Sequence, residues 1–296
     1  MGKKEKTVYF YHLETKEENI DNINNKFNET YQCFKNGNTN NVLTVSFNEK
    51  DYYIDAVDKC YPYDDDKYAW LISVSEVDPS KEIEIGNLDI QEVDKRNEKI
   101  ETSENQGPVV KTQILYDKNT CVIAIPRTNG GLNITTFTRF LRNFCDVRGL
   151  KLAIIIDKGK DDLENIISIS KLEFNISNIQ NMTIDERVSE LSDLKNAIKM
   201  GSDNYKATMV ATSLNLNKIK DKVKFILQNA GDADIKKLGI EGRDSDGIIE
   251  PIDLVAHKLH YHGSIEYSNT ITTKNVFEFL KEAYYKKLNC FKDYMV

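Results

Sequence analysis

Two neighbouring apolar segments, residues 109–116 and 121–126, most strongly limit the folds open to this chain. A short polar connection at Asp117, Lys118 and Asn119 joins them, and Asp and Asn are residues that favour tight turns. Apolar segments joined in this way predict a β-hairpin. Because a lone hairpin is only marginally stable in water, this one must belong to a larger sheet with an apolar face.

The rest of the chain alternates strand-like and helix-like segments, as judged from the spacing of apolar residues. Strands are expected at residues 7–13, 42–47, 52–57, 68–77, 152–156, 167–176, 206–214, 235–241, 246–249 and 257–267. Helices are expected at residues 16–34, at 137–144 with Asn133 or Thr135 as N-cap, at 184–200, at 217–229 with Asn217 as N-cap, and at 273–295. This content predicts a mixed α+β fold.

A change of composition at residues 79–108 suggests where the chain divides. The segment is rich in charge, poor in apolar residues and bounded on both sides by proline. Such a segment rarely buries enough apolar surface to fold alone, so we interpret it as a linker or a polar excursion. We therefore expect an N-terminal β-rich domain with one long helix at residues 1–78. A larger mixed-sheet domain that ends in a long helix is expected at residues 109–296.

Charge is distributed unevenly between these two parts. Residues 1–108 contain 13 Lys and Arg against 23 Asp and Glu, a balance of −10. The remaining residues contain 27 and 24, a balance of +3, and the whole chain carries −7. A net acidic chain disfavours DNA binding in general, because phosphate contacts require Lys and Arg. Charge can be segregated by face, however, so a local basic groove stays possible in the second part.

The five cysteines and the hydropathy of the chain indicate its compartment. The cysteines are odd in number, widely spaced and form no CxxC pair. Neither a disulfide framework nor a zinc site is therefore expected. No run of about 18 apolar residues, the length of a membrane helix, occurs in the sequence. We therefore expect a cytoplasmic protein with free thiols and no direct membrane insertion.

Motif searches give no basis for assigning catalysis. GxGxxG, GxxxxGK[ST] and GxSxG are absent. On a strand, His260, His262 and Glu266 share one face and could bind a divalent metal, although half-exposed strand histidines are the alternative interpretation. Asp157 and Glu173 could likewise hold Mg²⁺, but their spacing matches no nuclease pattern. We assign no catalytic residue and expect no cofactor.

Basic residues on three predicted helices are candidates for a binding surface. They occur together with aromatic or apolar residues, a combination that suits sequence-neutral contact with a nucleic-acid backbone and its bases. The same pattern also fits ordinary solvated helix faces. The candidate contact residues are Arg139, Arg142, Arg148, Lys218, Lys222, Lys281, Lys286, Lys287 and Lys292.

The last two thirds of the chain resemble a known family. RexA-like phage-exclusion proteins contain, in similar order, counterparts of the hairpin at residues 114–128, the helix at 136–141, the segment 218–229, the turn at 242–247 and the ending 284–292. The DNA-binding component of Kiwa defence systems has a comparable plan. The resemblance implies a homodimer that binds DNA non-specifically in phage exclusion, often beside a membrane-protein partner encoded nearby. It also implies that Arg127, at the end of the hairpin, contacts DNA.

Three hypotheses about function stay open at this point. The first is a sequence-neutral nucleic-acid-binding protein of a phage-exclusion or anti-phage defence system. The second is an acidic protein–protein interaction module, an adaptor or inhibitor in a defence or counter-defence system. The third is an enzyme such as a metal-dependent nuclease, which would need its carboxylates or histidines to converge in a pocket. Salt-dependent binding separates the first two, because phosphate contacts weaken steeply as salt rises.

Overall fold

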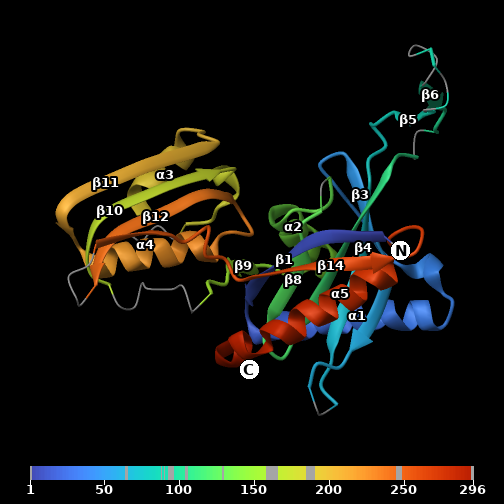
Figure 1. Ribbon diagram of the computed structural model, residues 1–296, viewed down its shortest axis with the longest axis horizontal. Coiled ribbons are helices and arrows are strands. Elements are labelled where there is room, and N and C mark those ends of the chain that lie inside the picture. The colour runs from blue at the N-terminus through green and yellow to red at the C-terminus, as the bar shows by residue number, and fades with distance from the viewer. Residues whose placement is uncertain are drawn as a thin grey trace.

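The computed structural model of the chain describes residues 2–63, 66–87, 89, 91–92, 97–103, 106–128, 130–157, 166–184, 191–244 and 249–294. Two lobes lie side by side, each built on its own β-sheet (Figure 1). Helices and strands are mixed along the chain, and its C-terminal segment is helical. The predicted mixed α+β fold is therefore confirmed.

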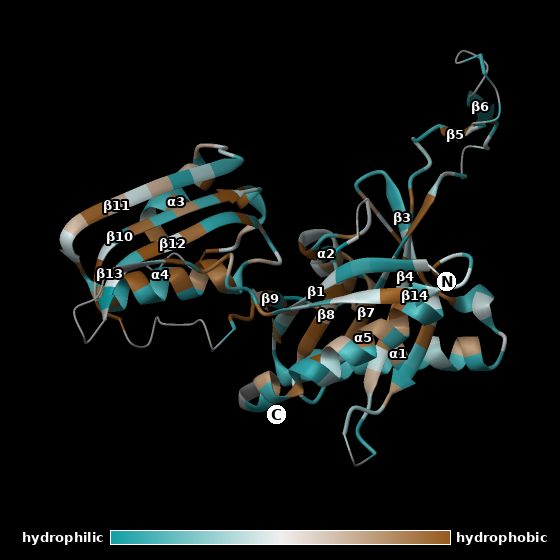
Figure 2. Cartoon of the chain, viewed as in Figure 1, coloured by the Kyte–Doolittle hydropathy of each residue, from teal (hydrophilic) through white to brown (hydrophobic). Residues whose placement is uncertain are grey.

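The larger lobe contains an antiparallel sheet in the order β14-β1-β8-β7-β4-β3-β2, with β9 also paired to β1. Its strands are β1 (Gly2–Glu14), β2 (Thr44–Phe47), β3 (Lys50–Cys60), β4 (Ala69–Val77), β7 (Val109–Asp117), β8 (Val122–Pro126), β9 (Lys151–Ile154) and β14 (His260–Tyr267). The predicted hairpin is β7 and β8, in which Leu115 pairs with Ala124. It lies in the middle of the sheet, where the strands are mostly hydrophobic (Figure 2).

Strand β1 is paired along both of its edges. On one edge, residues 8–12 pair with β8. On the other edge, residues 2–9 pair with β14 and residues 11–14 pair with β9. The first strand of the chain thus joins the central hairpin, the C-terminal strand and the strand that leads into the second lobe.

Helices cover both faces of this sheet (Figure 1). They are α1 (Glu17–Lys35), α2 (Ile134–Cys145) and α5 (Thr273–Lys287), the last followed by a 3-10 segment (Leu288–Tyr294). On the face covered by α1 and α2, the ring of Phe27 meets Trp70 of β4 edge-on. On the face covered by α5, the ring of Phe291 packs against Phe10 of β1. The sheet therefore buries apolar side chains on both sides.

The smaller lobe contains the antiparallel sheet β11-β10-β12-β13. Its elements are β10 (Ile166–Ser177), α3 (Ser192–Lys199), β11 (Asn204–Leu214), α4 (Leu216–Gln228), β12 (Asp234–Asp244) and β13 (Ile249–Asp253). Helix α4 packs against β10 and β12. Leu172, Phe174 and Ile176 are buried on this face, whereas Lys171 and Glu173 alternate with them and lie on the opposite, more exposed face.

Residues 79–108 do not separate two domains as expected, because strands from both sides of them belong to one sheet. β4 pairs with β7 from Trp70 opposite Tyr116 to Val77 opposite Val109. The predicted domains 1–78 and 109–296 therefore share one apolar core. The intervening segment is a polar excursion, the alternative interpretation, and carries the small hairpin of β5 (Ile83–Gly86) and β6 (Asn97–Ile100), which projects from the lobe (Figure 1).

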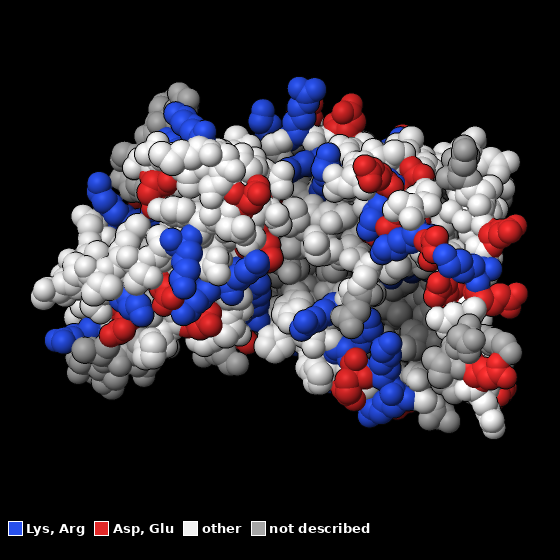
Figure 3. All heavy atoms as spheres, turned by 90° about the horizontal axis from the view of Figure 1, so that it is seen from above, with Lys and Arg blue, Asp and Glu red and all other residues white. Residues whose placement is uncertain are grey.

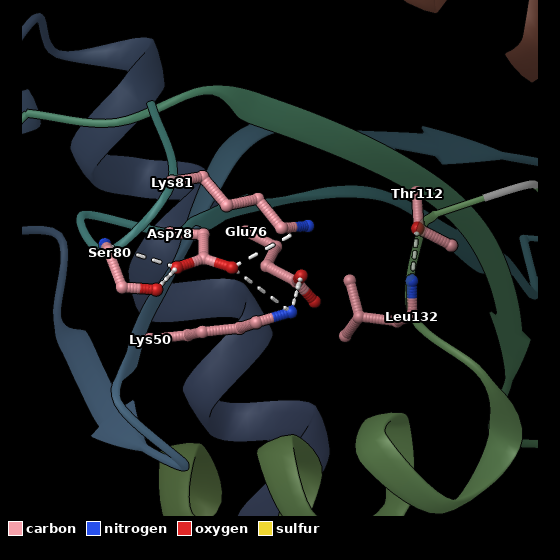
Figure 4. A network of polar contacts seen from close by, with 7 residues as sticks. All are labelled: Lys50, Glu76, Asp78, Ser80, Lys81, Thr112 and Leu132. Atoms are coloured by element: carbon pink, nitrogen blue, oxygen red, sulfur yellow. Dashed lines mark hydrogen bonds and ion pairs between the residues drawn. The ribbon is translucent and has the colours of Figure 1, made fainter. Parts of the chain in front are cut away.

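A charged network fixes the base of this excursion (Figure 4). The Lys50 ammonium group donates to Glu76 at 2.5 Å and lies 3.8 Å from a carboxylate oxygen of Asp78. Both carboxylates are almost fully buried. The Ser80 hydroxyl donates to Asp78 at 2.6 Å. This hydrogen bond is the main reason why the pKa of Asp78 lies below its usual value. The network keeps two buried acidic groups paired where the excursion leaves β4.

Several predicted helix ends differ from the observed ones. Helix α3 is shorter than the predicted helix at 184–200, of which residues 185–190 lie outside the described part of the chain. Asn215, and not Asn217, caps α4, because its side chain accepts from the Lys218 N–H at 3.1 Å. The last α-helix ends at Lys287 and continues as a 3-10 segment.

A buried carboxylate anchors α5 to the sheet. Asp117, the last residue of β7, is fully buried. Tyr284 of α5 donates to one of its oxygens at 2.6 Å, and Tyr63 donates to the same oxygen. Asn119 donates to the other oxygen at 2.8 Å through both its backbone and its side-chain nitrogen. Burial raises the pKa of Tyr284 well above its ordinary value, so the hydroxyl keeps its proton and acts as a donor.

Replacing this donor is expected to destabilise the protein. Tyr284→Phe leaves a buried carboxylate with one donor fewer, and we expect the free energy of unfolding to fall by about 1–3 kcal/mol. Tyr285→Phe is the matched control, because Tyr285 is 49% exposed and donates to the backbone carbonyl of Tyr61. Urea denaturation followed by circular dichroism measures both variants. Equal stability of the two would contradict the role assigned to Asp117.

Candidate nucleic-acid interface

A cavity of about 1110 Å³ lies where the two lobes meet. It is lined by Arg142, Asn143, Asp146, Val147, Arg148, Gly149, Leu150, Lys151, Thr183, Phe225 and Asp232. A second cavity of about 280 Å³ shares Arg142 and Asp232 with it and extends to Asn48 and Arg139. We call the two cavities together the interlobe groove. Seen from above, the molecule is hollowed between its lobes, and Lys and Arg side chains lie on both sides, interspersed with Asp and Glu (Figure 3).

The local sequence explains why α2 presents basic residues to this groove. Asn133, the first of the two predicted caps, accepts from the Thr136 N–H at 2.8 Å and fixes the start of the helix. The buried residues of the helix are Phe137, Thr138, Phe140, Leu141, Phe144 and Cys145. Arg139 and Arg142 lie three residues apart, outside this buried set, and both line the smaller cavity.

The chain turns sharply between α2 and β9, and this turn forms one wall of the groove. The backbone is left-handed at Asp146 (φ 51°) and at Gly149 (φ 72°). Asp tolerates this conformation and glycine adopts it without steric cost. The turn places the side chains of Arg148 and Lys151 along the larger cavity.

Arg142 is a structural cross-link within the groove. Its guanidinium forms an ion pair with Asp232 at 2.6 Å and donates through Nε to the backbone carbonyl of Leu150 at 3.2 Å. Asp232, between α4 and β12, is only 4% exposed. This contact ties the larger lobe to the smaller one, and it neutralises the charge that was expected to bind nucleic acid.

Three other basic side chains, which we call the basic rim, surround the groove: Arg139, Arg148 and Lys151. None of them forms an ion pair within the described ranges of the chain. The Arg139 guanidinium donates to the Asn48 side chain at 2.7 Å and lies 5.0 Å from the ring centre of Phe47, so its described partners are neutral. Their charge is therefore available to an anionic ligand.

Lys151 is the member of the basic rim that sequence reasoning misses. Its ammonium group lies 5.4 Å from the ring centre of Phe225 on α4, across the groove. In the sequence it only precedes an apolar strand, which gives no reason to group it with the basic residues of the helices. Its position three residues after Arg148, at the start of the strand that follows the turn, is the signal that could have identified it.

The structure assigns Lys222 a different role from the predicted one. Its side chain is buried, and its ammonium group lies 2.7 Å from both carboxylate oxygens of Asp193 on α3. It also lies 5.4 Å from the ring centre of Phe174. Lys222 therefore joins α3, α4 and the sheet of the smaller lobe and does not reach a ligand at the surface. Lys218, one turn earlier, is exposed.

The basic residues of the last helix lie apart from the groove, because α5 covers the opposite face of the sheet from α2. Lys281 forms an ion pair with Glu278 at 2.9 Å, and the Lys287 ammonium lies 4.0 Å from Asp157. Lys286 and Lys292 are exposed. Of the three aromatic residues expected to alternate with them, Tyr284 and Phe291 are buried in the core, and Tyr285 is 49% exposed. Two of the three aromatic side chains are therefore not available at the surface of the last helix.

Arg127 directly follows β8 and is exposed. Its backbone N–H donates to the Thr7 carbonyl at 2.8 Å, and its own carbonyl accepts from the Lys6 ammonium at 3.0 Å. Its backbone is thus fixed by β1, while its side chain is not among those that line the interlobe groove.

The histidines proposed as weak metal ligands have other partners. His262 lies 3.3 Å from Glu5 and hydrogen bonds to Thr7 at 3.1 Å, and His260 hydrogen bonds to the Lys258 carbonyl at 2.8 Å. Glu266 is exposed and takes no part in these contacts. Among the residues that the structure describes, no group of three His, Cys, Asp or Glu side chains could hold a metal ion.

Comparison with known proteins identifies a family but no activity. The chain belongs to a family of unknown function, DUF6731, whose model matches residues 1–293. No curated protein and no solved structure matches the chain significantly. In the described part of the chain, no helix is both long enough and apolar enough to cross a membrane.

The ion pair at the groove predicts a measurable effect on stability. Arg142→Met leaves the nearly buried carboxylate of Asp232 without its charged partner. We expect the free energy of unfolding to fall by about 3 kcal/mol, the low end for a buried pair, because the Arg142 side chain is 31% exposed. The double variant R142M/D232N is expected to recover part of this loss, because it buries no unpaired charge. Urea denaturation of the two single variants and the double variant measures the coupling. Simple additivity of the single effects would show that the pair does not join the lobes.

Proposed function

We propose that this chain is a cytoplasmic nucleic-acid-binding protein of a phage-exclusion or anti-phage defence system. It grips the phosphate backbone in the interlobe groove without strong sequence preference. The observation that carries the proposal is the convergence of Arg139, Arg148 and Lys151 on one groove, none of them in an ion pair in the described part of the chain. The resemblance to RexA-like and Kiwa-type proteins motivates the defence role.

The chemistry of the basic rim suits a polyanion. An arginine guanidinium presents parallel N–H donors that match two phosphate oxygens, and lysine adds a point charge. The acidic residues among the described lining are Asp146 and Asp232, and the second is already neutralised by Arg142. The local charge of the groove is therefore positive although the whole chain carries −7.

Neutral groups in the groove suit the other parts of a nucleic acid. The amides and hydroxyls of Asn143, Thr136 and Thr183 can hydrogen bond to sugar or phosphate oxygens. The ring of Phe225, which is half-buried and lines the larger cavity, offers an apolar surface against which a base can pack. Neither kind of contact reads the identity of a base, which agrees with sequence-neutral binding.

One observation favours the second hypothesis, an acidic interaction module. The excursion at residues 79–108 has twice as many acidic as basic residues, and its hairpin exposes Ile85 (56%) and Ile100 (42%). An acidic projection with apolar side chains suits contact with another protein. Such a module would retain no DNA even at low salt, so one binding assay separates the two functions.

Charge reversal at the basic rim tests the proposal. R148E/K151E is expected to weaken binding of a fluorescent oligonucleotide at least tenfold at low salt. It should also reduce the slope of log Kd against log salt by about two, because two phosphate contacts are lost. Fluorescence anisotropy with single- and double-stranded oligonucleotides measures both quantities.

The matched control is K286E/K292E, which makes the same charge change on the opposite face of the sheet and should bind as the wild type does. If the control loses binding and R148E/K151E keeps it, the last helix is the contact surface and the groove is not. If wild-type protein binds neither oligonucleotide at low salt, the nucleic-acid function is wrong. Phage plating on cells that carry wild type or R148E/K151E then tests the defence role.

A further inference from the structure

The edge strands of the two sheets differ in how well they are protected against pairing with another strand. Proteins commonly keep such edges short or place charge or proline in them. β2, at the edge of the larger sheet, has four residues. β13, at one edge of the smaller sheet, has five residues and contains Pro251. β11, at the other edge of the smaller sheet, has eleven residues, no proline and a single charge, Lys206, so it is longer than β2 and β13 and only weakly protected.

β11 is long, nearly uncharged and rich in residues that favour strands. It has eleven residues, from Asn204 to Leu214, with Lys206 as its one charged residue and no proline. Within the described ranges, β10 is the only strand that pairs with it, so its other edge presents free backbone donors and acceptors. On its outer face, Val210 is 72% exposed. An edge of this kind is a template for a further strand.

We infer that β11 pairs antiparallel with β11 of a second copy of this chain, so that two four-stranded sheets become one continuous sheet across a two-fold axis. The axis passes through Met209, the central residue of the strand. This register places Asn204 opposite Leu214 of the partner subunit. Against β10 the strand is regular from Asn204 to Val210, and its register shifts between Val210 and Leu214. An antiparallel pair is compatible with two-fold symmetry, in which each residue meets the same partner in both directions.

The sequence of β11 is complementary to itself in this register. On the outer face, Thr208 lies opposite Val210 of the partner subunit, a pairing that suits adjacent strands. Lys206 lies opposite Thr212 of the partner subunit, so the two lysines do not meet. No like charges therefore oppose the association, and this self-complementarity favours a second copy over an unrelated strand as the occupant.

An exposed methionine fits the same arrangement. Met200, in the turn between α3 and β11, is 85% exposed. The proposed register brings this turn beside the start of α4 of the partner subunit, where Leu216 of the partner subunit is half-buried. The dimer would thus cover an apolar side chain at each end of the paired strands. This interface differs from one on α5, where Phe277, Phe279 and Tyr284 are already used in the core.

Charge substitutions at positions 208 and 210 test both the dimer and its register, because these positions face each other across the axis. T208E/V210E and T208K/V210K each place like charges opposite one another, and both are expected to be monomeric. T208K/V210E places opposite charges there and is expected to stay dimeric. Within the chain this variant also sets its new lysine opposite Glu173 and its new glutamate opposite Lys171. Light scattering coupled to size exclusion at about 100 μM measures the mass of each.

Mixing the two like-charge variants is the most specific test of the proposed register. An equimolar mixture of T208E/V210E and T208K/V210K is expected to recover the dimer mass, because unlike charges then face each other. Circular dichroism and thermal melting show that each variant is folded. A monomeric wild type, a dimer that survives both like-charge pairs, or a mixture that stays monomeric would each overturn the proposal. Since none of these measurements involves nucleic acid, they test the dimer independently of the proposed function.

Discussion

The pairing of β1 along both of its edges is the constraint on which the rest of the structure depends. This strand begins the chain, yet it pairs with β8 from the middle, β14 from near the end and β9 from the connection to the smaller lobe. Without it, the central hairpin would present an open edge, and β9 and β14 would lose their place in the sheet. Contacts so distant in sequence carry a high entropic cost, which the buried apolar faces of the sheet must offset.

The geometry of the groove follows from the same strand. Glu14, the last residue of β1, pairs with Lys151 in the β1–β9 register and accepts from Gln228 of α4 at 3.3 Å. The N–H of Gly231, between α4 and β12, donates to the carbonyl of Leu152 at 3.1 Å. Together with the pair of Arg142 and Asp232, these contacts hold the two lobes on either side of one groove. Two members of the basic rim, Arg139 and Lys151, therefore lie on α2 and β9, and Arg148 lies in the short turn that joins these elements.

Local sequence patterns predicted most of the helices and strands. The predictions that were wrong concern features that depend on contacts between residues far apart in the sequence. The central hairpin, α1, β4 and the buried face of α2 follow from apolar spacing and turn residues, which act over a few positions. The expected boundary at 79–108 is wrong because pairing of β4 with β7 cannot be read from composition. Lys222 looked like a surface residue, since nothing near it in the sequence reveals Asp193 as its partner. Only three of the predicted residues, Arg139, Arg142 and Arg148, come together at the groove, and Arg142 serves as a cross-link.

The central claim is that nucleic acid lies in the interlobe groove, and photocrosslinking tests it most directly. A single-stranded oligonucleotide that contains 5-iodouracil would be irradiated with the wild-type protein, and the crosslinked peptides would be identified by mass spectrometry. Phe225 is the aromatic residue that lines the groove, so the account predicts crosslinks to the peptides that contain Phe225 and residues 139–151. Crosslinks confined to residues 281–292, on the opposite face of the sheet, would contradict it.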